Sequence, residues 1–185
     1  MRNFSIAALS VVTLGLAACS SSDDDMSEVD LPAKYDYLEG FVAAVEDDSL
    51  AHADAGMMTG TATLSGALEV SDVGEGLAAL GDLDLSADFT SGTLTGSVTD
   101  VGLYDEDTQE LDTSLAGALN VAGTISGSGL AATAIGTLSD DEDHALDLHL
   151  DGSFYDYEGD LATYGDVTGT IDGEDVEGGF AAIED

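Results

Sequence analysis

Two periodicities of apolar residues divide the chain at about residue 58. Between residues 30 and 48, apolar side chains recur every three or four positions, which predicts one short amphipathic helix. Its apolar stripe consists of Tyr35, Leu38, Phe41, Val42 and Val45. After Met58, apolar residues or Gly alternate with Thr, Ser and Asp. This pattern predicts strands with one buried face and one solvent-exposed face.

Turn-forming residues divide the alternating part of the chain into eight predicted strands. Their approximate ranges are 59–70, 78–89, 92–104, 113–121, 124–138, 145–155, 165–172 and 175–183. Leu83 and Leu85 share one face of the second strand, opposite Asp82 and Asp84. Successive antiparallel strands have exposed edges unless the sheet closes on itself. We therefore predict an all-β fold, an eight-stranded antiparallel up-and-down β-barrel with one short N-terminal helix.

The charge of the chain indicates which face of this barrel points inward. Its 185 residues include 39 Asp+Glu and only 2 Lys+Arg, so the net charge is −37 at pH 7. Aspartates facing the lumen would be dehydrated with almost no cations to pair with, which is prohibitively unfavourable. A membrane-spanning barrel also needs aromatic girdles, and this chain has no Trp and only 6% aromatic residues. We therefore expect an apolar interior, an acidic exterior and no nucleic-acid partner.

The first residues have the features of a secretory signal sequence. Arg2 precedes a short apolar run that ends in small residues, as in a signal peptide. The closing Leu16–Cys19 (LAAC) resembles the lipobox of bacterial lipoproteins, which implies that Cys19 is the lipid attachment residue. A plain signal peptide with an incidental Cys is the alternative. We expect a lipoprotein signal peptide at 1–18, an acidic flexible tether at 19–30, the N-terminal helix and linker at 31–58, and the barrel domain at 59–185.

Alternate loops of an up-and-down barrel lie on the same rim, and one set of loops in this chain is acidic. The candidate ligand-binding rim comprises Asp105, Glu106, Asp107, Asp140, Asp141, Glu142 and Asp143. The opposite rim has tight connections and one longer stretch at 156–164, and is expected to receive the helix. An acidic rim suits a basic protein or divalent cations. The alternative is a solvated face with no specific partner, because runs of like charge are usually just hydrated.

Motifs for catalysis are absent from the sequence. It contains no G-x-S-x-G, H-E-x-x-H or G-x-x-x-x-G-K, and Cys19 is its only Cys. We therefore expect no enzyme activity, no catalytic residue, no metal centre and no cofactor. Asp147, His149 and Asp151 share one strand face, but solvated side chains are a simpler interpretation than a ligand row. Tyrosine phenolates can hold haem iron, although packing with a wet hydroxyl is the favoured role for Tyr104, Tyr155, Tyr157 and Tyr164.

Five strand segments carry glycine-rich patterns found in a known family. They are Ser86–Phe89 (SADF), Ser91–Gly96 (SGTLTG), Leu115–Gly127 (LAGALNVAGTISG), Asp166–Gly173 (DVTGTIDG) and Val176–Ala182 (VEGGFAA). Over roughly residues 59 to 183, the chain resembles the single-barrel relatives of transferrin-binding protein B, solute-binding surface lipoproteins of Gram-negative bacteria. The resemblance implies capture of iron, haem or a host protein. Because the chain lacks the handle domain of bilobed members, we expect a ligand other than transferrin.

Together these inferences predict a lipid-anchored protein of the outer membrane, exposed at the cell surface, that captures a solute or protein. Iron or haem acquisition is the process that the resemblance implies. The expected partners are the membrane, through the N-terminal lipid, an unknown solute or basic protein, and an outer-membrane transporter. The alternative is a structural or protective acidic surface lipoprotein without a captured ligand.

Overall fold

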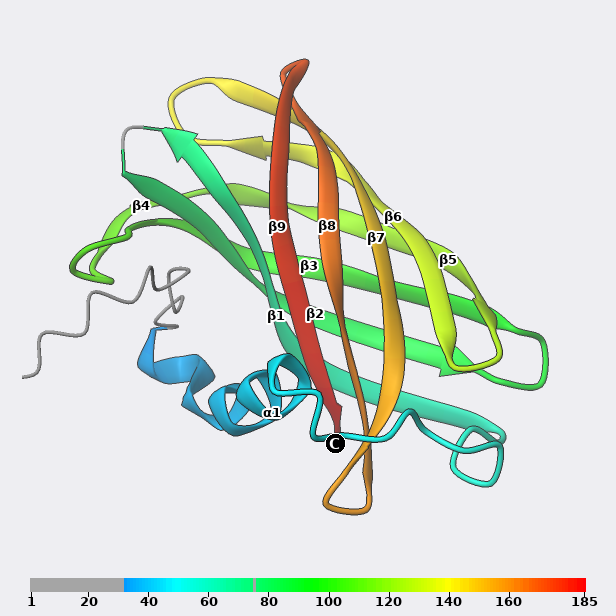
Figure 1. The fold of residues 1–185 in the computed structure, drawn as a ribbon. Helices are drawn as coiled ribbons and strands as arrows, with labels where there is room; N and C mark the ends of the chain where they lie inside the picture. The colour runs from blue at the N-terminus through cyan, green and yellow to red at the C-terminus, as the bar shows by residue number, and fades with distance from the viewer. Residues whose placement is uncertain (1–31, 75) are drawn as a thin grey trace, which may run out of the picture.

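The described part of the chain consists of one helix and nine strand segments. The computed structural model describes residues 32–74 and 76–185, so Cys19 and the regions predicted at 1–18 and 19–30 lie outside it. A 3-10 turn, η1 (Ala33–Tyr35), leads into α1 (Asp36–Glu46). The strands in Figure 1 are β1 (Thr61–Gly74), β2 (Leu77–Asp88), β3 (Thr93–Asp105), β4 (Leu111–Ser114), β5 (Ala116–Ser126), β6 (Gly129–Ser139), β7 (Asp143–Tyr157), β8 (Asp160–Ile171) and β9 (Glu174–Glu184).

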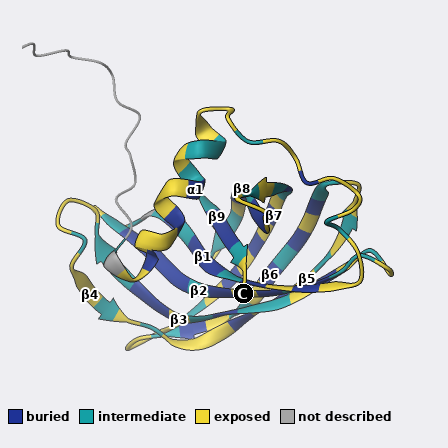
Figure 2. Ribbon diagram, turned by 90° about the horizontal axis from the view of Figure 1, so that it is seen from below, coloured by how far each residue is buried: buried dark blue, intermediate teal, exposed yellow. Residues whose placement is uncertain are grey.

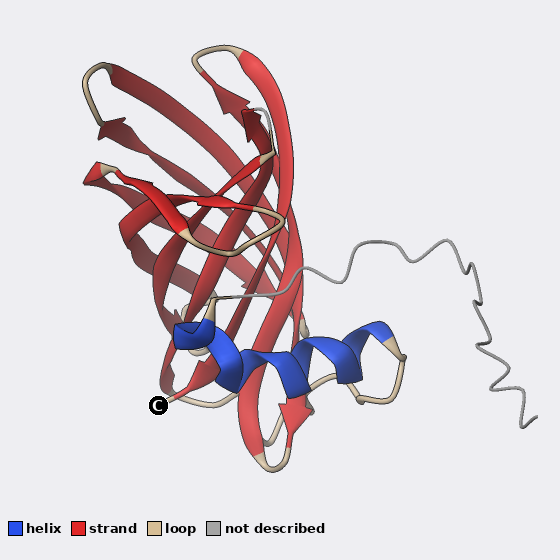
Figure 3. Ribbon diagram, turned by 90° about the vertical axis from the view of Figure 1, so that its left-hand side faces the viewer, coloured by secondary structure: helices blue, strands red, loops and turns tan. Residues whose placement is uncertain are grey.

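The strands form one closed antiparallel sheet. Neighbours along the sheet are β2, β1, β9, β8, β7, β6, β5 and β3, and β3 also pairs with β2, which closes the ring. The short β4 pairs with the far end of β3 and continues the line of β5 after a break at Leu115, whose N–H donates to the carbonyl of Val101 at 2.8 Å. β4 and β5 therefore act as one barrel strand. The predicted eight-stranded antiparallel barrel with one short helix is confirmed (Figures 1 and 3).

Apolar side chains fill the inside of the barrel, and carboxylates lie outside it. Leu83 and Leu148 belong to one cluster of buried residues that has members from all eight barrel strands. At alternate positions of the same strands, Asp84 and Asp147 are exposed. Figure 2 shows this division as buried residues that alternate with more exposed ones along the strands. The expected apolar interior and acidic exterior are confirmed.

The predicted boundary between the fourth and fifth strands is wrong. It places a turn at Ala122–Gly123, but β5 continues through this point and the chain reverses at Gly127–Ser128. Gly127 has a φ of 61°, which suits a tight hairpin. Gly123 lies within the strand, where an added Cβ would overlap the backbone carbonyl of Ala131. The sequence thus offers two candidate turn glycines, and the close approach of two strands decides which one makes the turn.

The connection predicted at 156–164 is also wrong, because β7 and β8 extend until only a two-residue turn remains. Glu158 and Gly159 form this turn with φ angles of 57° and 100°. Two successive residues with positive φ form the kind of turn that matches the twist of a hairpin. Strand pairing therefore continues through residues that the sequence pattern had assigned to a loop.

α1 packs against the outer wall of the barrel (Figures 2 and 3). Leu38 and Phe41 are fully buried in a cluster that includes the outward-facing Ala67, Ala162 and Ala181 of β1, β8 and β9. Small residues at these positions leave room for the helix, whose apolar stripe supplies the matching face. The helix thus covers part of the wall, and the expectation that the opposite rim receives it is wrong. No helix of the described residues is long and apolar enough to cross a membrane.

A polar contact holds the start of the helical segment on β2. Asp82 Oδ1 accepts hydrogen bonds from the Tyr35 hydroxyl at 2.7 Å and from Lys34 Nζ at 2.9 Å. Burial, and then the bond to Asp82, raises the pKa of Tyr35, so its hydroxyl stays protonated and remains a donor. Because Lys34 and Asp82 are exposed, their ion pair adds little stability, and the buried ring of Tyr35 provides most of the attachment.

The segment after α1 joins the end of the barrel that carries the β2–β3, β5–β6 and β7–β8 turns. His52 forms an isolated bridge with Tyr155, and the Ala53 N–H donates to the carbonyl of Phe154 at 2.9 Å. Ala53, Met57 and Met58 then pack against the apolar cluster inside the barrel. The chain itself therefore shields part of the core at this end.

A pair of substitutions tests which face of the sheet is inside. Leu148 is 0% exposed in the barrel core, whereas Ile135 on the outer face of β6 is 51% exposed. Leu148→Ala is expected to lower the free energy of unfolding by about 2–5 kcal/mol, because it removes apolar contacts and leaves a cavity. Ile135→Ala is expected to change it by about 0.5 kcal/mol. Urea unfolding followed by circular dichroism measures both, and a larger loss for Ile135→Ala would contradict the apolar interior.

Candidate functional site

The first acidic cluster of the predicted rim lies in the loop between β3 and β4. Asp105 Oδ1 accepts hydrogen bonds from the backbone N–H groups of Asp107 and Thr108 at 3.1 and 2.8 Å, and from the Thr108 hydroxyl at 2.9 Å. The bonds from Thr108 are the main reason that the pKa of Asp105 is lowered. The N–H of Glu106 donates to the carbonyl of Gly76 at 3.0 Å. Asp105 therefore shapes this loop, which is held against the β1–β2 turn.

The second acidic cluster lies in the β6–β7 turn and is joined to the β8–β9 turn by His144. His144 Nδ1 lies 2.8 Å from Asp172 Oδ2, and His144 Nε2 lies 3.5 Å from Asp140 Oδ1. The hydrogen bond to Asp172 is the largest cause that raises the pKa of His144, and the same bond lowers the pKa of Asp172. Asp140 Oδ1 also accepts a hydrogen bond from the Glu142 N–H at 2.9 Å. His144 had no predicted role, and the structure places it as a link between two turns.

The structure brings the predicted rim residues to one end of the barrel but divides them between two loops. Glu106, Asp107 and the run Asp141–Asp143 face solvent, and no described hydrogen bond or ion pair joins the two clusters. No group of three or more His, Cys, Asp or Glu side chains in the described chain is placed to hold a metal ion. This holds also for Asp147, His149 and Asp151, which lie exposed along β7. The rim as a surface for a basic partner stays a prediction.

The tyrosines considered as haem ligands lie around α1, on the outer wall of the barrel. The rings of Tyr155 and Tyr157 lie 6.1 and 5.3 Å from the ring of Phe41. Tyr104 and Tyr164 pack against the same cluster. Burial is the main reason that the pKa values of Tyr155 and Tyr164 are raised. A raised pKa disfavours the phenolate that binds iron, so these contacts support a packing role.

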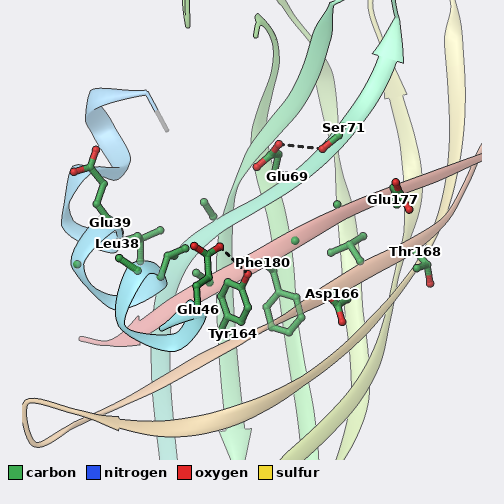
Figure 4. Close-up of a pocket in the computed structure, with 18 residues that line it drawn as sticks. Leu38, Glu39, Glu46, Glu69, Ser71, Tyr164, Asp166, Thr168, Glu177 and Phe180 are labelled. Atoms are coloured by element: carbon green, nitrogen blue, oxygen red, sulfur yellow. Dashed lines mark hydrogen bonds between the residues drawn. The ribbon is translucent and has the colours of Figure 1, made fainter. Parts of the chain in front are cut away.

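A groove of about 890 Å³ lies between α1 and the outer wall of the barrel (Figure 4). α1 lines one side of it from Leu38 to Glu46, and β1, β8 and β9 form its floor. Its apolar lining residues that keep some exposure are Val42 and Ala43 of α1 and Tyr164 of β8, because Leu38, Ala67 and Ala181 are buried under the helix. Its volume lies in the range of about 300–1,000 Å³ that is usual for pockets holding small organic molecules. We refer to it as the helix groove.

The lining of the helix groove carries five carboxylates and contains no Lys, Arg or His. Glu39 and Glu46 come from α1, Glu69 from β1, Asp166 from β8 and Glu177 from β9. All of them except Glu69 are exposed to solvent. The groove therefore combines an apolar surface with a field of a single, negative sign.

Glu69 is the one carboxylate of the groove that is partly buried. Its Oε1 accepts a hydrogen bond from the Ser71 hydroxyl at 3.2 Å (Figure 4). Burial raises the pKa of Glu69, the bond from Ser71 opposes this shift, and the negative charge of Glu106 raises the pKa further. A positive charge in the groove would favour the ionised form of Glu69 and so oppose the effects of its burial and of the Glu106 charge.

Three of these carboxylates surround a position on β9 that has no side chain. Glu69 of β1, Gly179 of β9 and Asp166 of β8 lie side by side in register. Glu177 precedes Gly179 by two residues and lies on the same outward face. An added Cβ at Gly179 would meet the carbonyl of Gly165 at 3.6 Å, an ordinary contact, so there is free space at this point. We refer to this open position in the groove floor as the Gly179 notch.

Sequence reasoning missed the helix groove because its two sides are far apart in the chain. Only the packing of α1 on β9 brings Glu39 and Glu46 near Glu177. One signal was available in Gly178–Gly179, where two adjacent glycines interrupt the alternation of the last strand. At Gly178 an added Cβ would overlap the backbone of Glu69, whereas Gly179 faces outward into free space.

Comparison with known proteins adds no family to these observations. The sequence matches no family model, and no curated protein matches it. The resemblance to the relatives of transferrin-binding protein B therefore remains a prediction from strand patterns.

The His144 link predicts a pH-dependent contribution to stability. The raised pKa of His144 means that its contribution is present below about pH 6.5 and is lost as the pH rises through the folded-state value. The lowered pKa of Asp172 means that its contribution is present above about pH 3.8 and is lost as the pH falls through the folded-state value. His144→Gln is therefore expected to lower the Tm slightly at pH 5 and to have almost no effect at pH 8.

Thermal melts across this pH range, monitored by circular dichroism, measure the difference. The matched control is His149→Gln, since His149 is exposed on the outer face of β7. The control is expected to change the pH profile less than His144→Gln does. A Tm difference for His144→Gln that is the same at pH 5 and pH 8 would show that the link contributes through packing and not through charge.

Proposed function

We propose that this protein is a non-enzymatic binding protein that captures a small ligand at the cell surface, in the helix groove. The observation that carries the proposal is the groove itself, an external cavity of about 890 Å³ with some apolar lining and five carboxylates. Such a combination of apolar lining and a few polar groups is typical of sites for small molecules. Binding of a ligand without a reaction needs no catalytic group.

Two other places in the molecule suit capture less well. The lumen is filled by the apolar cluster to which every barrel strand contributes, so a ligand there would have to displace packed side chains. At the rim, Asp105 and Asp140 already accept hydrogen bonds within their own turns. The helix groove is an open cavity and needs no such rearrangement.

We also propose that the protein is held at the outer membrane by a lipid on Cys19 and is exposed at the surface. The support is the LAAC sequence at Leu16–Cys19, followed by Ser20 and an acidic run suited to a tether. The resemblance to surface lipoproteins also supports a lipid anchor. It extends the proposal to iron or haem acquisition, with an outer-membrane transporter as partner. The exposed rim, with Glu106 and Asp141, is the surface that we propose for a basic protein partner.

The capture proposal is tested by native mass spectrometry of protein purified from its own host. The wild-type protein is expected to carry a bound small molecule. Gly179→Leu fills the notch without a clash at Cβ and is expected to reduce the retained fraction about tenfold, which corresponds to about 1.4 kcal/mol of binding free energy. Ala122→Leu is the matched control, because it adds the same side chain at an exposed position of β5.

Two results would contradict capture in the groove. Equal retention by wild-type and Gly179→Leu protein would place the ligand elsewhere. A wild-type protein with no bound mass, from cells grown with and without iron, would favour the alternative of an acidic surface lipoprotein that protects by hydration and repulsion.

The anchor is tested by following Cys19→Ser in fractionated cells. The wild-type protein is expected in the outer-membrane fraction, and the variant is expected to lose this membrane association, because a protein without acyl chains loses the apolar area that holds it there. Mass spectrometry of the mature N-terminus gives an independent readout. An unmodified Cys19, or cleavage at another position, would refute the proposed localisation.

A further inference from the structure

We infer that the helix groove selects a small organic amine, meaning a molecule with an apolar body and a protonated amino group. This inference rests on the proposed capture of a ligand in the same groove, and it specifies the chemical class of that ligand. Three features of the groove lead to it, namely the sign of its charge, the arrangement of its carboxylates and its exposed apolar lining.

The sign of the charge follows from which residues line the groove. Glu39, Glu46, Glu69, Asp166 and Glu177 approach it from four elements, and no basic side chain is among its lining residues. Like charges that face one cavity repel each other, and a bound cation reverses this interaction. An anionic ligand would meet repulsion from every side. The groove is therefore complementary to positive charge.

The arrangement of the carboxylates favours an organic cation over a metal ion. Glu69 and Asp166 flank Gly179 on the two neighbouring strands. The described residues include no set of three or more acidic, His or Cys side chains placed to hold a metal ion. An ammonium group has three N–H donors and accepts a looser arrangement of carboxylates around it. The Gly179 notch offers the space for such a group.

The exposed apolar part of the lining accounts for the rest of the ligand. Val42 and Ala43 of α1 and the ring of Tyr164 on β8 line the groove and keep some exposure to solvent, whereas Leu38, Ala67 and Ala181 are buried under the helix. A molecule with its amino group in the notch can therefore rest its apolar body against the exposed side chains of this lining and the backbone around them. Burial of this body adds binding free energy in proportion to the apolar area that it covers.

Other occupants that the chain itself offers have the wrong charge. Residues 20–31 contain five acidic residues and no Lys or Arg, so the segment that precedes the described structure is repelled by the groove. A second copy of the chain has the same net charge of −37 and would have to present an acidic surface. The partner is therefore a separate, positively charged molecule.

Binding of matched probes tests this ligand class. The full chain with Cys19→Ser is used, so that no lipid or detergent competes for the apolar probes. 4-Phenylbutylamine, 4-phenylbutan-1-ol and 4-phenylbutanoate share one apolar body and differ in charge, and putrescine supplies positive charge without that body. Isothermal titration calorimetry at low salt is expected to show the amine binding about tenfold more tightly than the alcohol, with little binding of the carboxylate or of putrescine. Raising NaCl to about 0.5 M should reduce the advantage of the amine over the alcohol.

Variants locate the effect in the groove. Glu177→Gln and Asp166→Asn are each expected to weaken binding of the amine severalfold while leaving the alcohol unchanged, because each removes one charge beside the notch. Asp147→Asn is the matched control, since it removes an exposed carboxylate from the outer face of β7, away from the groove. Gly179→Leu should weaken both the amine and the alcohol, because it fills the space that the two probes share.

Three outcomes would overturn the inference. They are equal affinity for the amine and the alcohol, an equal loss of amine binding in Asp147→Asn and Asp166→Asn, and unchanged amine binding in Gly179→Leu. The first of these, found together with a host-derived mass that Gly179→Leu no longer retains, would refute the amine and leave capture in the groove standing. A host-derived mass that Gly179→Leu still retains would instead refute the proposed function.

Discussion

The free energy lost when a carboxylate leaves water without a cation partner is the constraint on which the fold depends. With 39 acidic residues and 2 basic ones, the chain cannot pair its acids, so it has to keep them hydrated. Period-two alternation does this strand by strand, because strand aspartates such as Asp82, Asp84 and Asp147 are each followed by an apolar residue on the other face. Closing the sheet then encloses all the apolar faces in one core, to which residues such as Leu83 and Leu148 belong. The barrel and the acidic surface are two results of the same pattern.

The same constraint explains why the one helix lies where it does. The outer wall is mostly polar, but Ala67, Ala78, Leu80, Ala162 and Ala181 form an apolar area on it that α1 covers. Where this area ends, the outward positions become acidic again, first with Glu69 and Asp166. The helix groove lies at this border. An apolar surface and a set of carboxylates are therefore found in one cavity because the docking area of the helix meets the acidic coat.

The excess of acidic residues indicated the direction of the apolar face, and periodicity was sufficient to predict the helix and the number of barrel strands. Each of these depends on residues that are near one another in sequence, such as the stripe that contains Leu38 and Phe41. Strand boundaries were less predictable, because a glycine can either form a turn or lie within a strand where two backbones approach closely. Gly123 allows close approach of two backbones and Gly127 makes a turn, and the local sequence around the two residues is much the same. The helix groove was beyond prediction, because Glu46 and Glu177 come to line one cavity only after the helix docks.

The attachment of the helical segment to β2 has a mechanical consequence. Within the described chain, Lys34 and Tyr35 contact Asp82 of β2 just before α1 begins. A pull applied on the N-terminal side of α1 therefore acts first on this contact and on the packing of the helix. The next attachments along the chain are the bridge of His52 with Tyr155 and the hydrogen bond from Ala53 to Phe154, both on β7. The ladder of β1 with β9 and β2 follows these contacts along the chain, so tension would strain the helix groove before it acts along β1.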